Sequence, residues 1–364
     1  MRLFPGTLSR YFFVRYLKMF VAYFLAVVAI ILLVDFNETS SRLSGSENYS
    51  VAIAFTISVL RVPLVAQTAV PFIALLASIA TLIQLNRKYE LVVARASGVS
   101  AWQFLTPLLV ANFLLGLVAI FALNPLATNS VALVEEVMLE NQLSALSPTS
   151  DTGPPWFKQI TEDGETVIGA RIRAGGGTEL GDATFIRFNP EGEPLDRLEA
   201  KRASLTDGEW ILTDVVRYRA GSAREIIDEI QIPTNLQAEF LGESLEPAES
   251  ISIFELPGKI AAAQSYGVSA NSYSMQFHRL VAQPVLFGAM TVIAAMVSLR
   301  FVRFGQSMAV ILGGILAGFM LYVVSEVIQA FGEAGTLPPL AAAWLPVIVA
   351  ASLGTTVILH KEDG

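Results

Sequence analysis

The chain of 364 residues is 53% hydrophobic and only 15% charged, and its net charge is -8. A charged fraction this far below that of soluble domains argues against intrinsic disorder, collagen-like repeats and a basic nucleic-acid binder. Because the chain contains no cysteine, it has no disulfide framework, no thiolate metal site and no cysteine nucleophile. The composition therefore indicates a membrane protein.

Six apolar segments are long enough to cross a bilayer as helices, since a span needs about 20 residues. They fall into two groups of three, separated by a long polar stretch. The segments are residues 19–34, 62–85, 102–123, 280–299, 308–331 and 337–359. We therefore predict an α-helical membrane protein with six transmembrane helices, three plus three.

The distribution of lysine and arginine in the short loops predicts the orientation, because cationic flanks stay in the cytoplasm. Basic residues cluster before the first segment, after the second and after the fourth. The opposite loops offer only Arg42 between the first two segments and none between the last two. We expect both termini to be cytoplasmic. A cleaved signal peptide is the less favoured alternative, because no small-residue cleavage site follows the first segment before Asp35.

The stretch between the two groups of apolar segments has the composition of an extracytoplasmic all-β domain. Four segments combine β-branched or aromatic residues with partial alternation, and residues typical of turns separate them. The strand-like segments are 166–173, 185–188, 210–218 and 225–232, and the turns are 175–177, 189–192 and 207–208. We expect eight or more short strands, which form a sandwich, a barrel or an open roll whose edges accept a partner strand. The apolar side of these strands forms either an ordinary core or a groove that holds lipid.

The chain is therefore predicted to have three parts. Residues 1–125 hold the first three spans, residues 126–274 hold the β domain with its flanking helices, and residues 275–364 hold the last three spans. One flanking helix is expected at 130–143, and the other follows the capping pattern formed by Ser252 and Glu255.

The loop at 86–98 is predicted to form a short helix, because charged residues surround an apolar centre and Gly98 suits a helix C-terminus. Such a helix either lies on the membrane surface with snorkelled arginines or docks in a groove of a cytoplasmic partner. The chain has no phosphate-binding loop, no plausible nucleophile and base, and no metal cluster. We therefore expect no enzymatic activity and no catalytic, metal or cofactor residues, and any energy must come from another chain.

The segment from Glu90 to Gly98 resembles the E-L-x-x-x-x-A-x-G motif of the LptF/LptG family of lipopolysaccharide-export permeases. The similarity extends over most of the chain and includes the Gln283-Pro284 step in the fourth span. Three late segments, residues 322–326, 335–339 and 343–346, are more similar to the LptG branch than to the LptF branch.

The resemblance implies a permease subunit of an ABC transporter in the bacterial inner membrane. In this family LptF and LptG form a heterodimer over two copies of the ATPase LptB, which binds the ATP and magnesium. Lipopolysaccharide enters from the outer leaflet and leaves through β domains that are open jelly rolls, continued by LptC and LptA. The resemblance also makes the helix at 86–98 a coupling helix, with Glu90 as the charged contact and Arg87 and Arg95 beside it.

Four charged residues suggest a site for the phosphates of the lipid. Counting about 20 residues back from the cytoplasmic ends of spans two and four places Arg61 and Arg279 near the outer boundary, and Glu326 lies at a similar depth. We hypothesise that Arg61, Arg279 and Arg42 hold lipid phosphates, with Glu326 as a partner in the empty site. The family's lysines after span one are absent here. Ordinary interfacial anchoring with one internal ion pair is the alternative.

Span five carries Gly314 and Gly318 in a small-x-x-x-small register that lets helices approach closely. Since spans one and five meet the partner permease in the family, the two glycines belong either to that subunit seam or to packing within the bundle. Two rival functions remain for the whole chain. One is a membrane sensor or scaffold that transports nothing, and the other is a mechanotransmitting ABC subunit that drives periplasmic partners.

Overall fold

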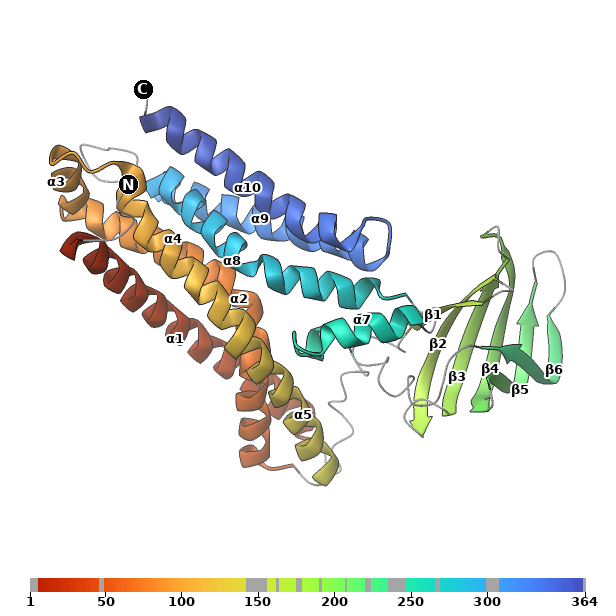
Figure 1. Cartoon of the computed structure of the whole chain (residues 1–364). Coiled ribbons are helices and arrows are strands. Elements are labelled where there is room, and N and C mark those ends of the chain that lie inside the picture. The colour runs from red at the N-terminus through yellow and green to blue at the C-terminus, as the bar shows by residue number, and fades with distance from the viewer. Residues whose placement is uncertain are drawn as a thin grey trace. The chain divides into compact units, whose positions relative to one another are not determined.

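The computed structural model divides the chain into two compact units, which we call the helical unit and the β unit. The helical unit comprises Met1–Leu143 and Met275–Gly364, and the β unit comprises Ser144–Ser274. The structure describes residues 6–45, 49–141, 156–161, 164–174, 179–189, 192–206, 208–219, 224–234, 247–265, 269–298 and 308–362. The two units are described separately below, and Figure 1 labels their elements.

Six helices among the described residues are long and apolar enough to cross a membrane, which confirms the prediction of six spans. They are α1 (Thr7–Leu43), α2 (Val51–Arg87), the continuous run of α4 (Ala101–Val118), η1 (Ala119–Leu123) and α5 (Asn124–Glu140), α8 (Asn271–Ser298), α9 (Met308–Glu333) and α10 (Pro339–Glu362). The end of the fourth predicted span, residue 299, lies outside the described residues.

Three of these helices, α1, α2 and the run from α4 to α5, are much longer than the apolar segments that predicted them. Helices α1 and α2 have 37 residues each, which at 1.5 Å per residue is about 55 Å, against about 30 Å of hydrocarbon. Helix α1 continues into polar sequence at both ends, whereas α2 begins at Val51 in an apolar stretch that Arg61 separates from the predicted span. The residues after Asp35 on α1 are helical and carry Glu38 and Arg42 beyond the predicted span, whereas the helical residues before Arg61 on α2 are uncharged.

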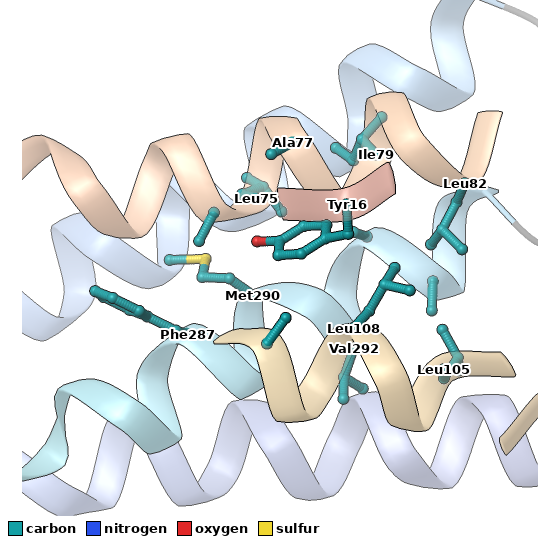
Figure 2. Packing of buried hydrophobic residues seen from close by; sticks show 14 of the residues in the cluster. Tyr16, Leu75, Ala77, Ile79, Leu82, Leu105, Leu108, Phe287, Met290 and Val292 are labelled. Atoms are coloured by element: carbon teal, nitrogen blue, oxygen red, sulfur yellow. The ribbon is translucent and has the colours of Figure 1, made fainter. Parts of the chain in front are cut away.

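A buried cluster holds α1 against α2, α4 and α8 at one end of the helical unit. Phe12, Tyr16 and Phe20 repeat every fourth residue along α1, so they lie on one face, and all three are buried. Figure 2 shows the Tyr16 ring among side chains from α2, α4 and α8. Beyond Phe20 the packing becomes sparser: Tyr23, Phe24 and Val27 still pack against the cluster, but none of residues 21–34, all of which the structure describes, is buried in the single chain.

Four fully buried polar side chains form a network inside this apolar cluster. The Tyr16 hydroxyl donates to Oδ1 of Asn112 (2.7 Å), and the Asn112 amide donates to Oγ1 of Thr291 (2.5 Å). Thr291 also lies 3.4 Å from the Ser78 hydroxyl. Polar groups buried in apolar surroundings are costly unless they are paired. The network therefore favours one arrangement of α1, α2, α4 and α8.

The described part of the β unit contains six strands in one antiparallel sheet of order β1-β2-β3-β4-β5-β6. This is fewer than the eight or more strands expected. The strands are β1 (Trp156–Thr161), β2 (Gly164–Ala174), β3 (Glu179–Phe188), β4 (Pro194–Thr206), β5 (Glu209–Tyr218) and β6 (Glu225–Pro233). All four strand-like segments fall within β2, β3, β5 and β6, but β1 and β4 were missed. The alternation of buried and exposed residues in β4 is difficult to recognise from the sequence, because charged residues alternate with small buried ones such as Ala200 and Ala203.

The sheet bends along a row of residues that crosses three central strands. Asp182 on β3, Lys201 on β4 and Asp214 on β5 each drop out of the Cα register while their neighbours remain paired. Asp182 and Asp214 have left-handed backbones, with φ of 48° and 55°, a conformation that aspartate tolerates better than most residues. The pairing register is the same on both sides of this row, but the alternation of buried residues moves by one position across it in all three strands. The described strands β3, β4 and β5 have 10, 13 and 10 residues and each continues through this row.

The inner face of the bent sheet is buried and largely apolar, with Asp196 as a buried carboxylate on the same side of β4 as Leu198. Phe185 and Trp210 meet edge to face at 5.9 Å between ring centroids, and both are fully buried. The sheet is open, with β1 and β6 at its two edges. Side chains nevertheless join these edges at one corner, because Thr234, just after β6, donates to Gln159 of β1 (2.7 Å). Among the alternatives of sandwich, barrel and open roll, the structure selects a rolled open sheet.

The predicted flanking helices are present as α5 and as α7 (Leu256–Ser265). The turn predicted at 175–177 lies outside the described residues, as do parts of those at 189–192 and 207–208. Their glycines Gly192 and Gly208 are described, and both have positive φ, as expected of turns.

Candidate functional site

The predicted short helix at 86–98 is present as α3 (Glu90–Ala96). Tyr89 precedes it with φ of 60°, and Gly98 follows it with φ of 83°, so both ends are sharp turns. Leu91 and Ala94 are buried, whereas Tyr89 and Val93 are 71% and 67% exposed. One face of α3 is therefore seated in the helical unit, and the other presents an aromatic and an aliphatic side chain outward.

Glu90 bonds to α1 of its own chain. Nη1 of Arg15 donates to both carboxylate oxygens of Glu90, at 2.9 and 3.2 Å. Nε of Arg15 donates to the Gln84 side chain of α2 (3.3 Å), and Tyr11 contacts both Arg15 and Glu90. The Arg15 and Glu90 side chains are only 15% and 27% exposed. We call Tyr11, Arg15, Gln84 and Glu90 the α1–α3 cluster.

The two arginines expected beside Glu90 are both exposed. Arg87 is the last residue of α2. Arg95 lies in the last turn of α3, and its guanidinium stands 5.7 Å from the centre of the Phe104 ring of α4. This distance suits a cation–π contact. The outward face of α3 thus has positive charge beside Tyr89 and Val93.

At the other end of the helical unit, the structure gives Arg61 an acidic partner that the sequence analysis did not select. Nη1 of Arg61 lies 3.6 Å from Oδ1 of Asp35 on α1, and Thr39 donates to the same carboxylate (3.3 Å). The Asp35 side chain is mostly buried, whereas that of Arg61 is 43% exposed. Arg42 pairs with Glu38 one turn earlier on α1 (2.7 Å), and both are exposed.

The remaining candidates lie on the second group of helices. Arg279 on α8 and Glu326 on α9 are both partly buried. Their proposed contact with lipid phosphate stays a prediction. The signal for Asp35 was present in the sequence as an acidic residue directly after the first apolar segment. Its link to Arg61 needed the antiparallel register of α1 and α2, which no local pattern reveals.

Gly314 and Gly318 make close contacts within the chain. A Cβ added to Gly314 would lie 2.6 Å from Val297, and one added to Gly318 would clash with Leu75 of α2. Both glycines are buried. The close approach seen here is thus that of α9 to its own bundle, whereas the seam with a partner permease remains a prediction.

The six helices long and apolar enough to cross a bilayer, with an antiparallel sheet inserted between the third and fourth, define the class of multi-pass membrane proteins with an inserted β unit. The model of the family "Lipopolysaccharide export system permease LptF/LptG" matches residues 10–360, so the chain belongs to this family.

The similar curated proteins are LptG permeases. The chain is 26% identical to the lipopolysaccharide export system permease protein LptG of Haemophilus influenzae over 372 aligned residues, covering 98% of this chain and 99% of the relative. It is 24% identical to LptG of Escherichia coli K12 over 315 residues, covering 83% of this chain and 84% of the relative. The chain is therefore a lipopolysaccharide export permease, and these relatives agree with the predicted similarity to the LptG branch.

Proposed function

We propose that this chain is the LptG-like subunit of an ABC transporter in the bacterial inner membrane. Paired with an LptF-like permease, it extracts lipopolysaccharide from the outer leaflet and passes it to a periplasmic bridge of LptC-like and LptA-like proteins. The observation that carries this proposal is the family match, which spans both groups of helices and the β unit. The order of helices, inserted sheet and helices is the one a lipid exporter of this kind needs.

An LptB-like ATPase dimer supplies the power, and α3 is the coupling helix. This assignment is supported by the outward face of α3, where Tyr89 and Val93 are exposed between basic residues. Exposed apolar side chains on a short helix suit a groove of a partner protein. In this arrangement both termini and α3 are cytoplasmic, and the β unit is periplasmic, in agreement with the distribution of basic residues.

The rolled sheet is the proposed receiver of the acyl chains. Lipid chains cannot be left in water, because each exposed methylene costs about 0.8 kcal/mol. Phe185 and Trp210 form an apolar part of the inner face of the sheet, and an apolar surface suits the passage of acyl chains. At the membrane, Arg61 and Arg279 are the proposed contacts of the lipid phosphates, with Arg42 and Glu326 nearby in depth.

Reconstitution tests this function directly. The chain is co-expressed with an LptF-like permease and an LptB-like ATPase, purified through a tag on the chain, and placed in vesicles with lipopolysaccharide and the periplasmic acceptor. We expect the ATPase to co-purify and lipopolysaccharide to reach the acceptor only with ATP. Co-purification with ATP-driven movement of the partners but without lipid transfer would identify a mechanotransmitting subunit. A chain that binds no ATPase would be a sensor or scaffold.

A further inference from the structure

We propose that the Arg15–Glu90 pair is the joint through which movement of α3 reaches α1, so that Arg15 is a positioning residue for transport. This inference rests on the proposed role of α3 as the coupling helix. It assigns Glu90 a task inside the chain, in addition to any contact with the ATPase.

The covalent chain leaves α1 without a direct connection to α3. Helix α3 has seven residues and follows α2 after a sharp turn at Tyr89, while a second turn at Gly98 leads into α4. A force on α3 is therefore transmitted through the backbone to α2 and α4. Arg15 and Glu90 are 75 positions apart, and the backbone of α1 joins α2 at Val51, the end of α2 far from α3. Near α3, helix α1 therefore follows the same force through side-chain contacts.

The geometry of the α1–α3 cluster suits such a joint. The Arg15 guanidinium bonds both oxygens of Glu90 and also the Gln84 side chain of α2, so one planar group holds two elements. Arginine is suited to this task because its donors are fixed in a fork. The pair is also largely shielded from water, and shielding strengthens a charged hydrogen bond relative to one on an open surface.

Arg15 lies in the part of α1 that is anchored in the buried cluster. Arg15 precedes Tyr16, whose buried hydroxyl belongs to the polar network with Asn112. The buried Phe12 lies on the preceding turn. Residues 21–34 have no buried member, and Asp35 is the next buried residue of α1. Only partly buried residues hold this stretch between its ends, so its tilt depends on the anchors at the two ends, and the joint to α3 is one of them.

A charge-swap experiment in the reconstituted complex tests the joint. The variants are Arg15→Glu, Glu90→Arg and the double swap, with Arg10→Glu as the control, because Arg10 is an exposed arginine of the same helix and its loss changes the net charge equally. The readouts are co-purified ATPase, ATP hydrolysis and lipopolysaccharide released per ATP. We expect each single swap to lower release per ATP by about tenfold, and the double swap to restore most of it.

The outcomes separate the joint from the proposed function. If wild-type complexes release no lipopolysaccharide, the proposed function fails irrespective of Arg15. If wild type is active and Arg15→Glu behaves like Arg10→Glu, the joint is refuted while the proposed function stands. If Glu90→Arg loses the ATPase and Arg15→Glu does not restore binding, Glu90 acts through the partner and the joint is again refuted.

A covalent substitute for the ion pair provides a second test. The chain has no cysteine, so Arg15→Cys with Glu90→Cys creates a unique thiol pair, which a short bifunctional thiol reagent can bridge. We expect the double variant to be poorly coupled before bridging and to regain release per ATP afterwards. No recovery in molecules that are bridged and retain their ATPase would overturn the proposal.

Discussion

The hydroxyl of Tyr16 donates a 2.7 Å hydrogen bond to Oδ1 of Asn112, and both side chains are fully buried in the apolar core of the helical unit. This contact joins α1 to α4. Asn112 continues the connection to Thr291 on α8, so one asparagine holds three helices together.

We expect Tyr16→Phe to destabilise the helical unit by about 0.5 to 2 kcal/mol, because the Asn112 oxygen loses its donor within an apolar core. Thermal unfolding of the purified complex in detergent measures the change. The control is Tyr23→Phe, which removes a hydroxyl from a partly exposed tyrosine on the same helix and should have little effect. Equal effects of the two substitutions would contradict the proposed importance of the network.

The contact between α4 and α8 depends on Gly116. A Cβ added there would lie 2.5 Å from Cα of Pro284, and backbone cannot move away as easily as a flexible side chain. We expect Gly116→Ala to destabilise the protein by about 1 to 3 kcal/mol, measured by thermal unfolding in detergent. Gly288→Ala on α8 is the matched control, since nothing lies within 4 Å of its added Cβ. It should be neutral or stabilising, because alanine favours helices over glycine.

The β unit contains a buried carboxylate, that of Asp196, whose removal should be destabilising. The Asp196 side chain is 1% exposed, accepts two hydrogen bonds from Arg187 (2.7 and 2.6 Å) and lies 3.2 Å from Nε of Arg217. Removing it leaves two arginines without their shared partner. We expect Asp196→Ala to destabilise the β unit by about 3 to 5 kcal/mol.

Hydrogen exchange of β3, β4 and β5 in the full-length chain measures this loss. The control is Asp228→Ala, which removes an exposed aspartate of β6 that does not have a left-handed backbone. Faster exchange confined to Asp196→Ala is the expected result. Unchanged exchange in that variant would show that the two arginines find other partners.

The lipid-phosphate hypothesis is tested by photo-crosslinking in the membrane. Photoreactive residues at Arg61 and Arg279 should give adducts with lipopolysaccharide, because both positions are proposed to face its phosphates. A probe at Val59, exposed on α2 two residues away, controls for general contact with lipid, since it points to a different side of the helix. Adducts with bulk phospholipid only, unchanged by lipopolysaccharide, would refute the hypothesis.

The predictions from sequence were confirmed for features that depend on a short stretch of the chain. Each of the six apolar segments is long enough by itself to require a helix, and Gly98 ends α3 because glycine tolerates the required φ. The eight or more strands expected from the sequence are not all found among the described residues, which contain six strands. Strand β4 was missed because burial there depends on neighbouring strands rather than on its own composition.

The sequence by itself determined the membrane class, the two groups of three spans, the inserted β unit and the resemblance to a permease family, because hydropathy, turn residues and a motif act over short stretches. Only the tertiary structure decided which charges pair. Arg15 with Glu90 and Arg61 with Asp35 are joined by helices whose register depends on packing over their whole length. That packing is a sum of many weak contacts, and no single segment of the chain contains it.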